Sequence, residues 1–158
     1  MTEQYLQSLV DGLDIKCKLL DELTEYTNKQ QQIVAEPNID WEEFDRTVDK
    51  KAELIEKLDQ NDNGFQAVFD RIKDEVKLNK EKYKSYIEKL QSGILRATEK
   101  STALLALEQR TKAKVEQSFS REKSRIQQSR SKSKAVNNYY NNMNRINFID
   151  PQLMDQKK

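Results

Sequence analysis

The chain has 158 residues, enough for one domain, and charged and hydrophobic side chains each make up 35% of it. Three glycines and two prolines leave little material for the many turns of a β-rich fold, so the composition predicts long helices. There is no histidine, and the single cysteine lacks a partner for a disulfide or a catalytic pair. We therefore expect a cytoplasmic protein that is not an enzyme and holds no metal or other cofactor.

Charge is distributed unevenly along the chain, although the formal net charge is only +1. Residues 1–63 hold 16 acidic and 7 basic side chains, whereas residues 121–158 hold 3 and 9. A basic end can attract nucleic acid, a membrane or an acidic partner. Because the basic segment is short and the whole chain nearly neutral, we expect no nucleic-acid binding. No apolar run approaches the roughly 20 residues that cross a bilayer, so we also expect no membrane insertion.

The first predicted helix covers residues 2–35 and ends before Pro37, which removes a backbone donor. Steps of three and four residues place its apolar positions on one face. That face consists of Leu6, Leu9, Val10, Leu13, Cys17, Leu20, Leu23, Thr27, Gln30 and Val34.

The second predicted helix covers residues 40–60, with Asp40 as its N-cap and Glu43 completing a capping box. Its inner face consists of Trp41, Phe44, Val48, Lys51, Ile55 and Leu58. The run Asn61-Asp62-Asn63-Gly64 contains residues that tolerate left-handed geometry. It predicts a compact turn that sends the next helix back antiparallel.

The third predicted helix covers residues 65–129, and its 65 or so residues would span about 95 Å. The stripe stays in register through Ser92-Gly93, which predicts a continuous helix there rather than a fold-back into a four-helix bundle. The inward positions are Phe65, Phe69, Ile72, Val76, Asn79, Tyr83, Tyr86, Leu90, Ile94, Ala97, Ser101, Leu104, Glu108, Thr111, Val115, Phe119, Glu122 and Ile126.

Together these elements predict an all-α fold, an elongated antiparallel three-helix bundle or coiled coil with one very long third helix. Residues 1–130 would form the bundle. Residues 131–158 would form a basic, serine-containing linker and a partly disordered apolar tail.

The far end of the third helix has no predicted cover, because the first two helices are too short to reach it. The apolar tail also needs a surface to cover it. We expect seam and tail to bind an amphipathic partner helix; the alternative is that the tail folds back on the seam and closes the protein's own core. The expected partner-binding residues are Leu104, Leu107, Val115, Phe119, Ile126, Tyr139, Tyr140, Met143, Phe148, Leu153 and Met154.

Three stretches carry a resemblance to a known family. They are the run from Asp49 to Asp59 with its Glu53-Leu54-Ile55, the pattern from Tyr83 through Leu90 and Glu108 to Lys112, and the tail. In the tail, the resemblance lies in Ser133-Lys134-Ala135, Tyr139-Tyr140, Met143 and the run from Gln152 to Lys158. The chain resembles the flagellar type III export chaperones of the FlgN family, in the form found in Gram-positive bacteria.

That resemblance implies a small helical chaperone of the cytoplasm that uses no nucleotide. It would bind the C-terminal helices of hook–filament junction proteins, prevent their premature association and deliver them to the flagellar export apparatus. As a free protein it would be a monomer or a weak homodimer. Two alternatives remain open, a self-associating structural coiled coil and a chaperone for the filament cap protein.

Overall fold

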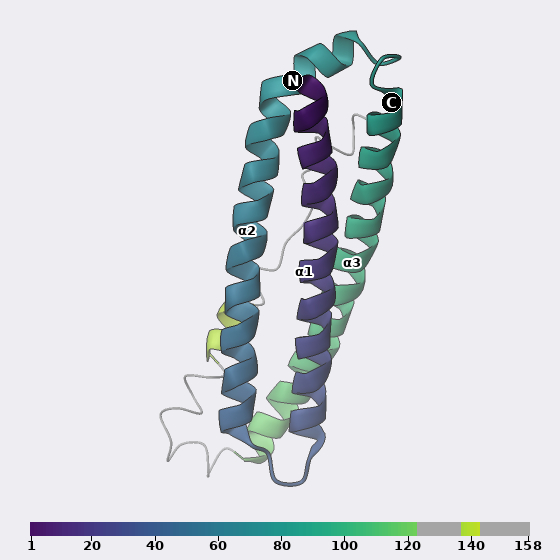
Figure 1. The fold of residues 1–158 in the computed structure, drawn as a ribbon. Coiled ribbons are helices and arrows are strands. Elements are labelled where there is room, and N and C mark those ends of the chain that lie inside the picture. Colours follow the sequence, from purple (N-terminus) through teal and green to yellow (C-terminus); the bar gives the residue numbers. More distant parts are fainter. Residues whose placement is uncertain (123–136, 143–158) are drawn as a thin grey trace. The chain divides into compact units, whose positions relative to one another are not determined.

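The computed structural model describes residues 1–122 and 137–142, and about 91% of these residues are helical, with no strand among them. Three long helices make up the fold, α1 (Thr2–Ala35), α2 (Trp41–Leu78) and α3 (Lys84–Arg121) (Figure 1). Residues 137–142 add one short helical segment. The expected all-α class is confirmed, and the three long helices pack against each other, α1 against α2 and α1 against α3.

The first helix, α1, has the predicted bounds and the predicted inner face. Leu6, Leu9, Leu20 and Leu23 are almost completely buried, and so are the polar side chains of Thr27 and Gln30. Cys17 is buried among these leucines. The face is buried because its members recur every three or four residues and so lie on one side of the helix.

The second helix, α2, begins as predicted but is almost twice as long. The backbone N–H of Glu43 donates to Asp40 Oδ1 at 3.0 Å, which is the expected cap. The turn predicted at Asn61–Gly64 is wrong, since α2 runs through these residues to Leu78.

Contacts with α1 explain why the helix continues through residues that favour turns. Asn61 Nδ2 donates to the carbonyl oxygen of Gly12 at 2.9 Å, and Lys16 Nζ pairs with Asp62 Oδ1 at 2.9 Å. Beyond them Phe65 packs in the same cluster as Leu6 and Leu9 of α1. These tertiary interactions outweigh the weak helix propensity of the run Asn61–Gly64.

The chain instead reverses at residues 79–83, which contain neither glycine nor proline. Asn79 Nδ2 donates to the carbonyl oxygen of Glu75 at 2.8 Å, and the N–H of Tyr83 donates to the carbonyl oxygen of Asn79 at 3.2 Å. These bonds satisfy backbone groups that the end of a helix leaves without partners. The very long third helix expected from residue 65 is therefore wrong; α2 and α3 have 38 residues each.

The predicted continuity of the third helix at Ser92-Gly93 is confirmed, because α3 includes both residues. A Cβ atom on Gly93 would lie 2.9 Å from Leu13 Cδ1 and 3.1 Å from Leu13 Cβ. Glycine thus permits α1 and α3 to approach closely here.

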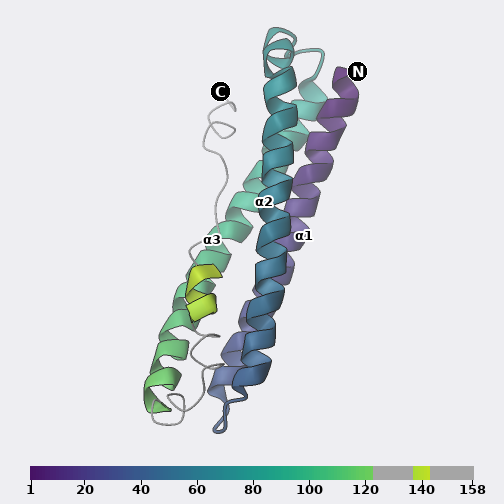
Figure 2. The same cartoon turned by 90° about the vertical axis from the view of Figure 1, so that its left-hand side faces the viewer.

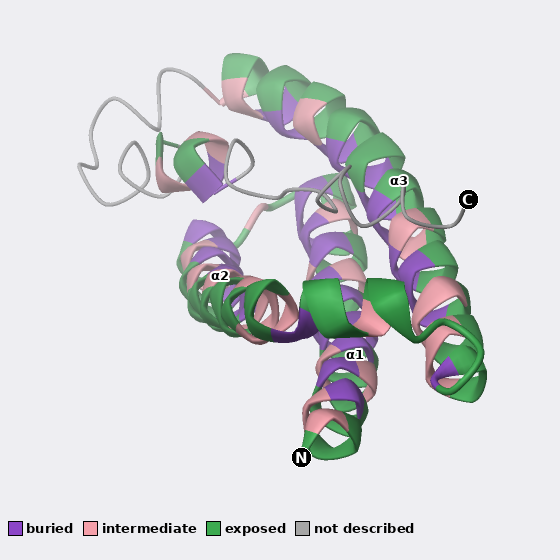
Figure 3. Ribbon diagram, turned by 90° about the horizontal axis from the view of Figure 1, so that it is seen from above, coloured by how far each residue is buried: buried purple, intermediate pink, exposed green. Residues whose placement is uncertain are grey.

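The chain divides into two compact units, and each helix contributes one part to each. Of the described residues, unit 1 contains Met1–Leu20 and Lys57–Ser101, and its main apolar cluster includes Leu6, Leu9, Ile72 and Tyr83. Unit 2 contains Asp21–Glu56 and the described part of Thr102–Asn147. Buried residues recur along one side of each long helix (Figure 3).

Candidate functional site

Most of the predicted partner-binding residues that the structure describes are buried within unit 2. Leu104, Leu107, Val115 and Tyr139 are at most 8% exposed. Phe119 and Tyr140 are partly buried and pack against the same cluster. The remaining predicted residues lie outside the described part of the chain, and they are Ile126, Met143, Phe148, Leu153 and Met154.

The expectation that α1 and α2 leave the far seam uncovered is wrong. Val115 of α3 shares a cluster with Val34 of α1 and with Trp41 and Phe44 of α2. The prediction failed because it ended the second helix near residue 60 and began the third at residue 65. With the reversal at residues 79–83 instead, the C-terminal part of α3 belongs to the same unit as the N-terminal part of α2.

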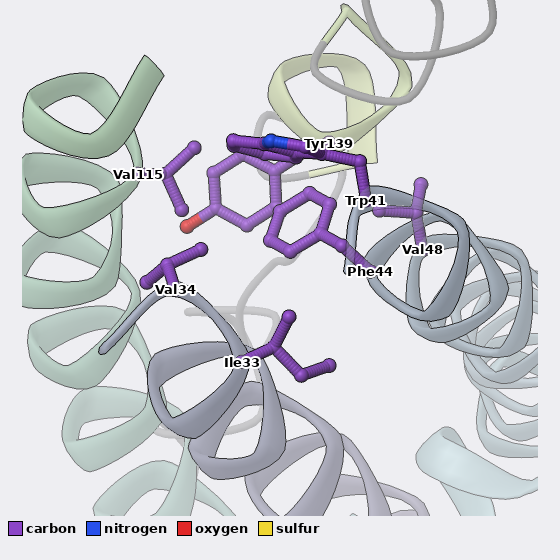
Figure 4. Close-up of a cluster of buried hydrophobic side chains, with 7 residues drawn as sticks. All are labelled: Ile33, Val34, Trp41, Phe44, Val48, Val115 and Tyr139. Carbon is purple, nitrogen blue, oxygen red and sulfur yellow. The ribbon is translucent and has the colours of Figure 1, made fainter. Parts of the chain in front are cut away.

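We call the buried apolar cluster of unit 2 the distal cluster; it consists of Ile33, Val34, Trp41, Phe44, Val48, Val115 and Tyr139 (Figure 4). Its aromatic rings meet edge to face or tilted, an arrangement that adds to the energy of apolar burial. The centroids of Trp41 and Phe44 are 5.4 Å apart, and those of Phe44 and Tyr139 are 5.7 Å apart. The indole Nε1 of Trp41 donates to Glu122 Oε2 at 2.7 Å.

Residues 137–142 supply Tyr139 to the distal cluster and lie beside α3 (Figure 2). Tyr140 adds a more exposed contact, with its hydroxyl donating to Glu116 Oε1 at 3.2 Å. Asn142 is 8% exposed, and its Nδ2 donates to the carbonyl oxygen of Val48 at 3.0 Å. These six residues therefore fold back onto the protein's own helices, as the alternative expectation for the tail states.

Next to the distal cluster lies a buried group of hydrogen-bonded polar side chains that we call the polar core. It consists of Thr27, Gln30, Lys51, Glu108 and Tyr139, so the two groups share Tyr139. Glu108, which is 0% exposed, accepts from Thr27 Oγ1 at 2.8 Å, from Tyr139 OH at 3.1 Å and from Lys51 Nζ. Lys51 Nζ also donates to Gln30 Oε1 at 3.0 Å. The ammonium group of Lys51 lies 5.3 Å from the centroid of the Tyr139 ring.

Burial changes the proton affinity of two members of the polar core. Desolvation lowers the pKa of Lys51, and the charge and hydrogen bond of Glu108 oppose that change. Desolvation raises the pKa of Tyr139 far above its ordinary value, and the negative charge of Glu108 raises it further. Tyr139 is therefore a neutral hydrogen-bond donor throughout the physiological pH range.

One polar atom of this group has no partner among the described residues. Gln30 Nε2 is buried and makes no hydrogen bond, although the same amide accepts from Lys51 through its oxygen. A buried amide without a hydrogen bond costs free energy, so the polar core stabilises the fold less than its ion pair alone implies.

The sequence pattern correctly placed each of these side chains on a buried helix face, but it did not predict that they contact one another. Gln30, Lys51 and Glu108 each occupy a seam position of a different predicted helix, where apolar side chains are the rule. Three polar residues in three seams, two of them with opposite charges, are the signal from which a buried network could have been predicted.

The described residues have neither a metal-binding cluster nor a membrane-spanning helix. They contain no group of three or more histidine, cysteine, aspartate or glutamate side chains that could hold a metal ion. None of the three described long helices is apolar enough over a sufficient length to span a membrane. Comparison of the chain with family models, with curated proteins and with solved structures gave no match.

Proposed function

We propose that this chain is a flagellar type III export chaperone of the kind its tail and seam resemble. It binds hook–filament junction proteins through their C-terminal helices, shields their apolar faces and delivers them to the export apparatus. It performs no chemical reaction, needs no cofactor and works in the cytoplasm. The observation that carries the proposal is the packing of residues 137–142, a short helical segment, against α2 and α3 in unit 2. We call the surface of unit 2 that they cover the seat.

A seat of this kind suits the task, because an amphipathic helix binds by laying its apolar face into a groove. Phe44, Val115 and Phe119 supply the apolar surface against which Tyr139 and Tyr140 pack. A partner helix takes the place of residues 137–142 on that surface. The chaperone thus closes its own groove when it is free and opens it to a partner.

Calorimetry with purified junction proteins tests the proposal through Phe119→Asp, which puts a charge beside the distal cluster. Leu105→Asp is the matched control, since Leu105 also lies on α3 in unit 2 but is 38% exposed and outside the distal cluster. We expect Phe119→Asp to weaken binding at least about 10-fold, the equivalent of about 1.4 kcal/mol, and Leu105→Asp to leave it unchanged. Circular dichroism of both variants checks that the helices persist.

Two results would contradict the proposal. One is that the wild-type chain binds no junction protein, and the other is that both variants bind as tightly as wild type. A pull-down that yields the filament cap protein instead would support the sister chaperone. A dimer that light scattering finds at all concentrations, unaffected by any partner, would support a structural coiled coil.

A further inference from the structure

Two polar anchors, and not apolar packing alone, hold residues 137–142 in their seat. Tyr139 reaches Glu108 with its hydroxyl, and Asn142 reaches the carbonyl oxygen of Val48 with its amide. The two side chains are three residues apart, so a helix presents them on one face. Both are buried, with Tyr139 at 1% and Asn142 at 8% exposure.

The carboxylate that accepts from the tyrosine is also held by α1 and α2. Thr27 donates to one oxygen of Glu108 at 2.8 Å, and Lys51 donates to the same oxygen. Tyr139 donates to the other oxygen, Oε2. With residues 137–142 in place the carboxylate is 0% exposed, so the hydroxyl of Tyr139 supplies the hydrogen bond to this oxygen in place of water.

We infer that this seat is a recognition site for helices in which a tyrosine is followed three residues later by an asparagine. Residues 137–142 are its resident ligand, and the partner helix carries the same Tyr-x-x-Asn pair. The inference rests on the proposed function for the identity of the partner, but the site itself can be tested without any junction protein.

The chemistry of the site selects against close analogues. A phenylalanine fills the same space between Phe44 and Val115 but brings no donor to Glu108. A site built to hydrogen-bond a hydroxyl group rejects ligands without it, because the buried acceptor is then left unpaired. We expect the loss of the hydroxyl to weaken binding at least about 10-fold.

The resident segment has the advantage of belonging to the same chain. Intramolecular attachment raises its effective concentration, so a free peptide competes poorly with it. The test therefore uses the full chain carrying Tyr139→Ala and Asn142→Ala, which disables the resident ligand and leaves Glu108 and Val48 in place. Circular dichroism checks that this variant keeps its helices.

The probe is a synthetic peptide with the sequence of residues 135–144, added to the isotopically labelled variant and followed by nuclear magnetic resonance. We expect it to shift the amide resonances near Val48, Glu108 and Val115. A peptide with phenylalanine in place of the tyrosine should bind at least about 10-fold more weakly, and one with alanine at both anchor positions should not bind.

Equal binding of the tyrosine and phenylalanine peptides would overturn the inference, and so would a failure of the unaltered peptide to bind the folded variant. Neither result refutes the proposed function, because junction proteins could still bind by apolar packing and calorimetry tests their binding separately. Conversely, a peptide that binds with the expected selectivity supports the site even where no junction protein binds.

Discussion

Replacing Lys51 by methionine should destabilise the protein strongly, although the two side chains have similar lengths. The Lys51 and Glu108 side chains are 2% and 0% exposed, so their ion pair is fully buried. Lys51→Met leaves the carboxylate in place with only the neutral donors of Thr27 and Tyr139. Breaking a buried pair in this way costs about 3–5 kcal/mol, against a total stability of about 5–15 kcal/mol for a typical domain.

The double variant Lys51→Met/Glu108→Leu should cost less than the two single changes added together. It removes both charges at once and replaces them with apolar side chains of similar volume, a change that is often close to neutral. Some loss remains, because Thr27 and Tyr139 then lose the carboxylate as an acceptor. Thr27 keeps the carbonyl oxygen of Leu23 at 2.7 Å, and Tyr139 keeps only the carbonyl oxygen of residue 108 at 3.4 Å. We expect a favourable coupling of about 2 kcal/mol or more between the two positions.

Urea unfolding measures these differences, with circular dichroism reporting the helices and Trp41, the sole tryptophan, reporting the distal cluster. Lys50→Met is the matched control, since Lys50 is the neighbouring residue but is 57% exposed and pairs only loosely with Glu53 at 3.7 Å. That change should stay within about 0.5 kcal/mol of wild type. A cost below about 1 kcal/mol for Lys51→Met, or simple additivity in the double variant, would refute the reasoning.

Glycine replacements at two helical positions should have opposite effects on the free energy of unfolding. Gly64→Ala should stabilise by about 0.5–1 kcal/mol, because a Cβ there meets nothing within 4 Å, whereas Gly93→Ala should destabilise by about 1–3 kcal/mol through its clash with Leu13. Effects of the same sign in urea unfolding would contradict this. The raised pKa of Tyr139 means that its contribution to stability is complete below pH 10 and is lost as the pH rises further, by about 1.4 kcal/mol per pH unit. Tyr139→Phe should remove that part of the alkaline slope, and identical slopes would argue against a buried, protonated Tyr139.

The faces of the helices could be predicted from the sequence because burial follows the helical period. The stripe identified even polar members of the core, such as Thr27, Lys51 and Glu108, which are all buried. The turn could not be found in the same way. The stripe passes in register through Asn79 and Tyr83, so periodicity gives no sign that the chain reverses there.

The misplaced turn also explains why the polar core was missed. In an antiparallel hairpin, residues equally distant from the turn lie opposite each other. A turn near residue 62 would place position 51 opposite about position 74, where no seam carboxylate lies. The observed reversal near residue 81 places it opposite about position 111, one turn of helix from Glu108. Pairing across a hairpin depends on the position of the turn, and tertiary contacts decided that position.

The polar core in turn constrains how the helices of unit 2 pair. A seam built from leucines alone tolerates a shift of one helix along another, because each apolar side chain can replace the next. Lys51 has no such freedom, since any shift that separates it from Glu108 leaves two unpaired charges in the interior. Tyr139 completes the arrangement from outside the three long helices, by bringing a donor to the carboxylate that fixes their register. A partner helix that binds in place of residues 137–142 would therefore donate a hydrogen bond to the same carboxylate that pairs with Lys51.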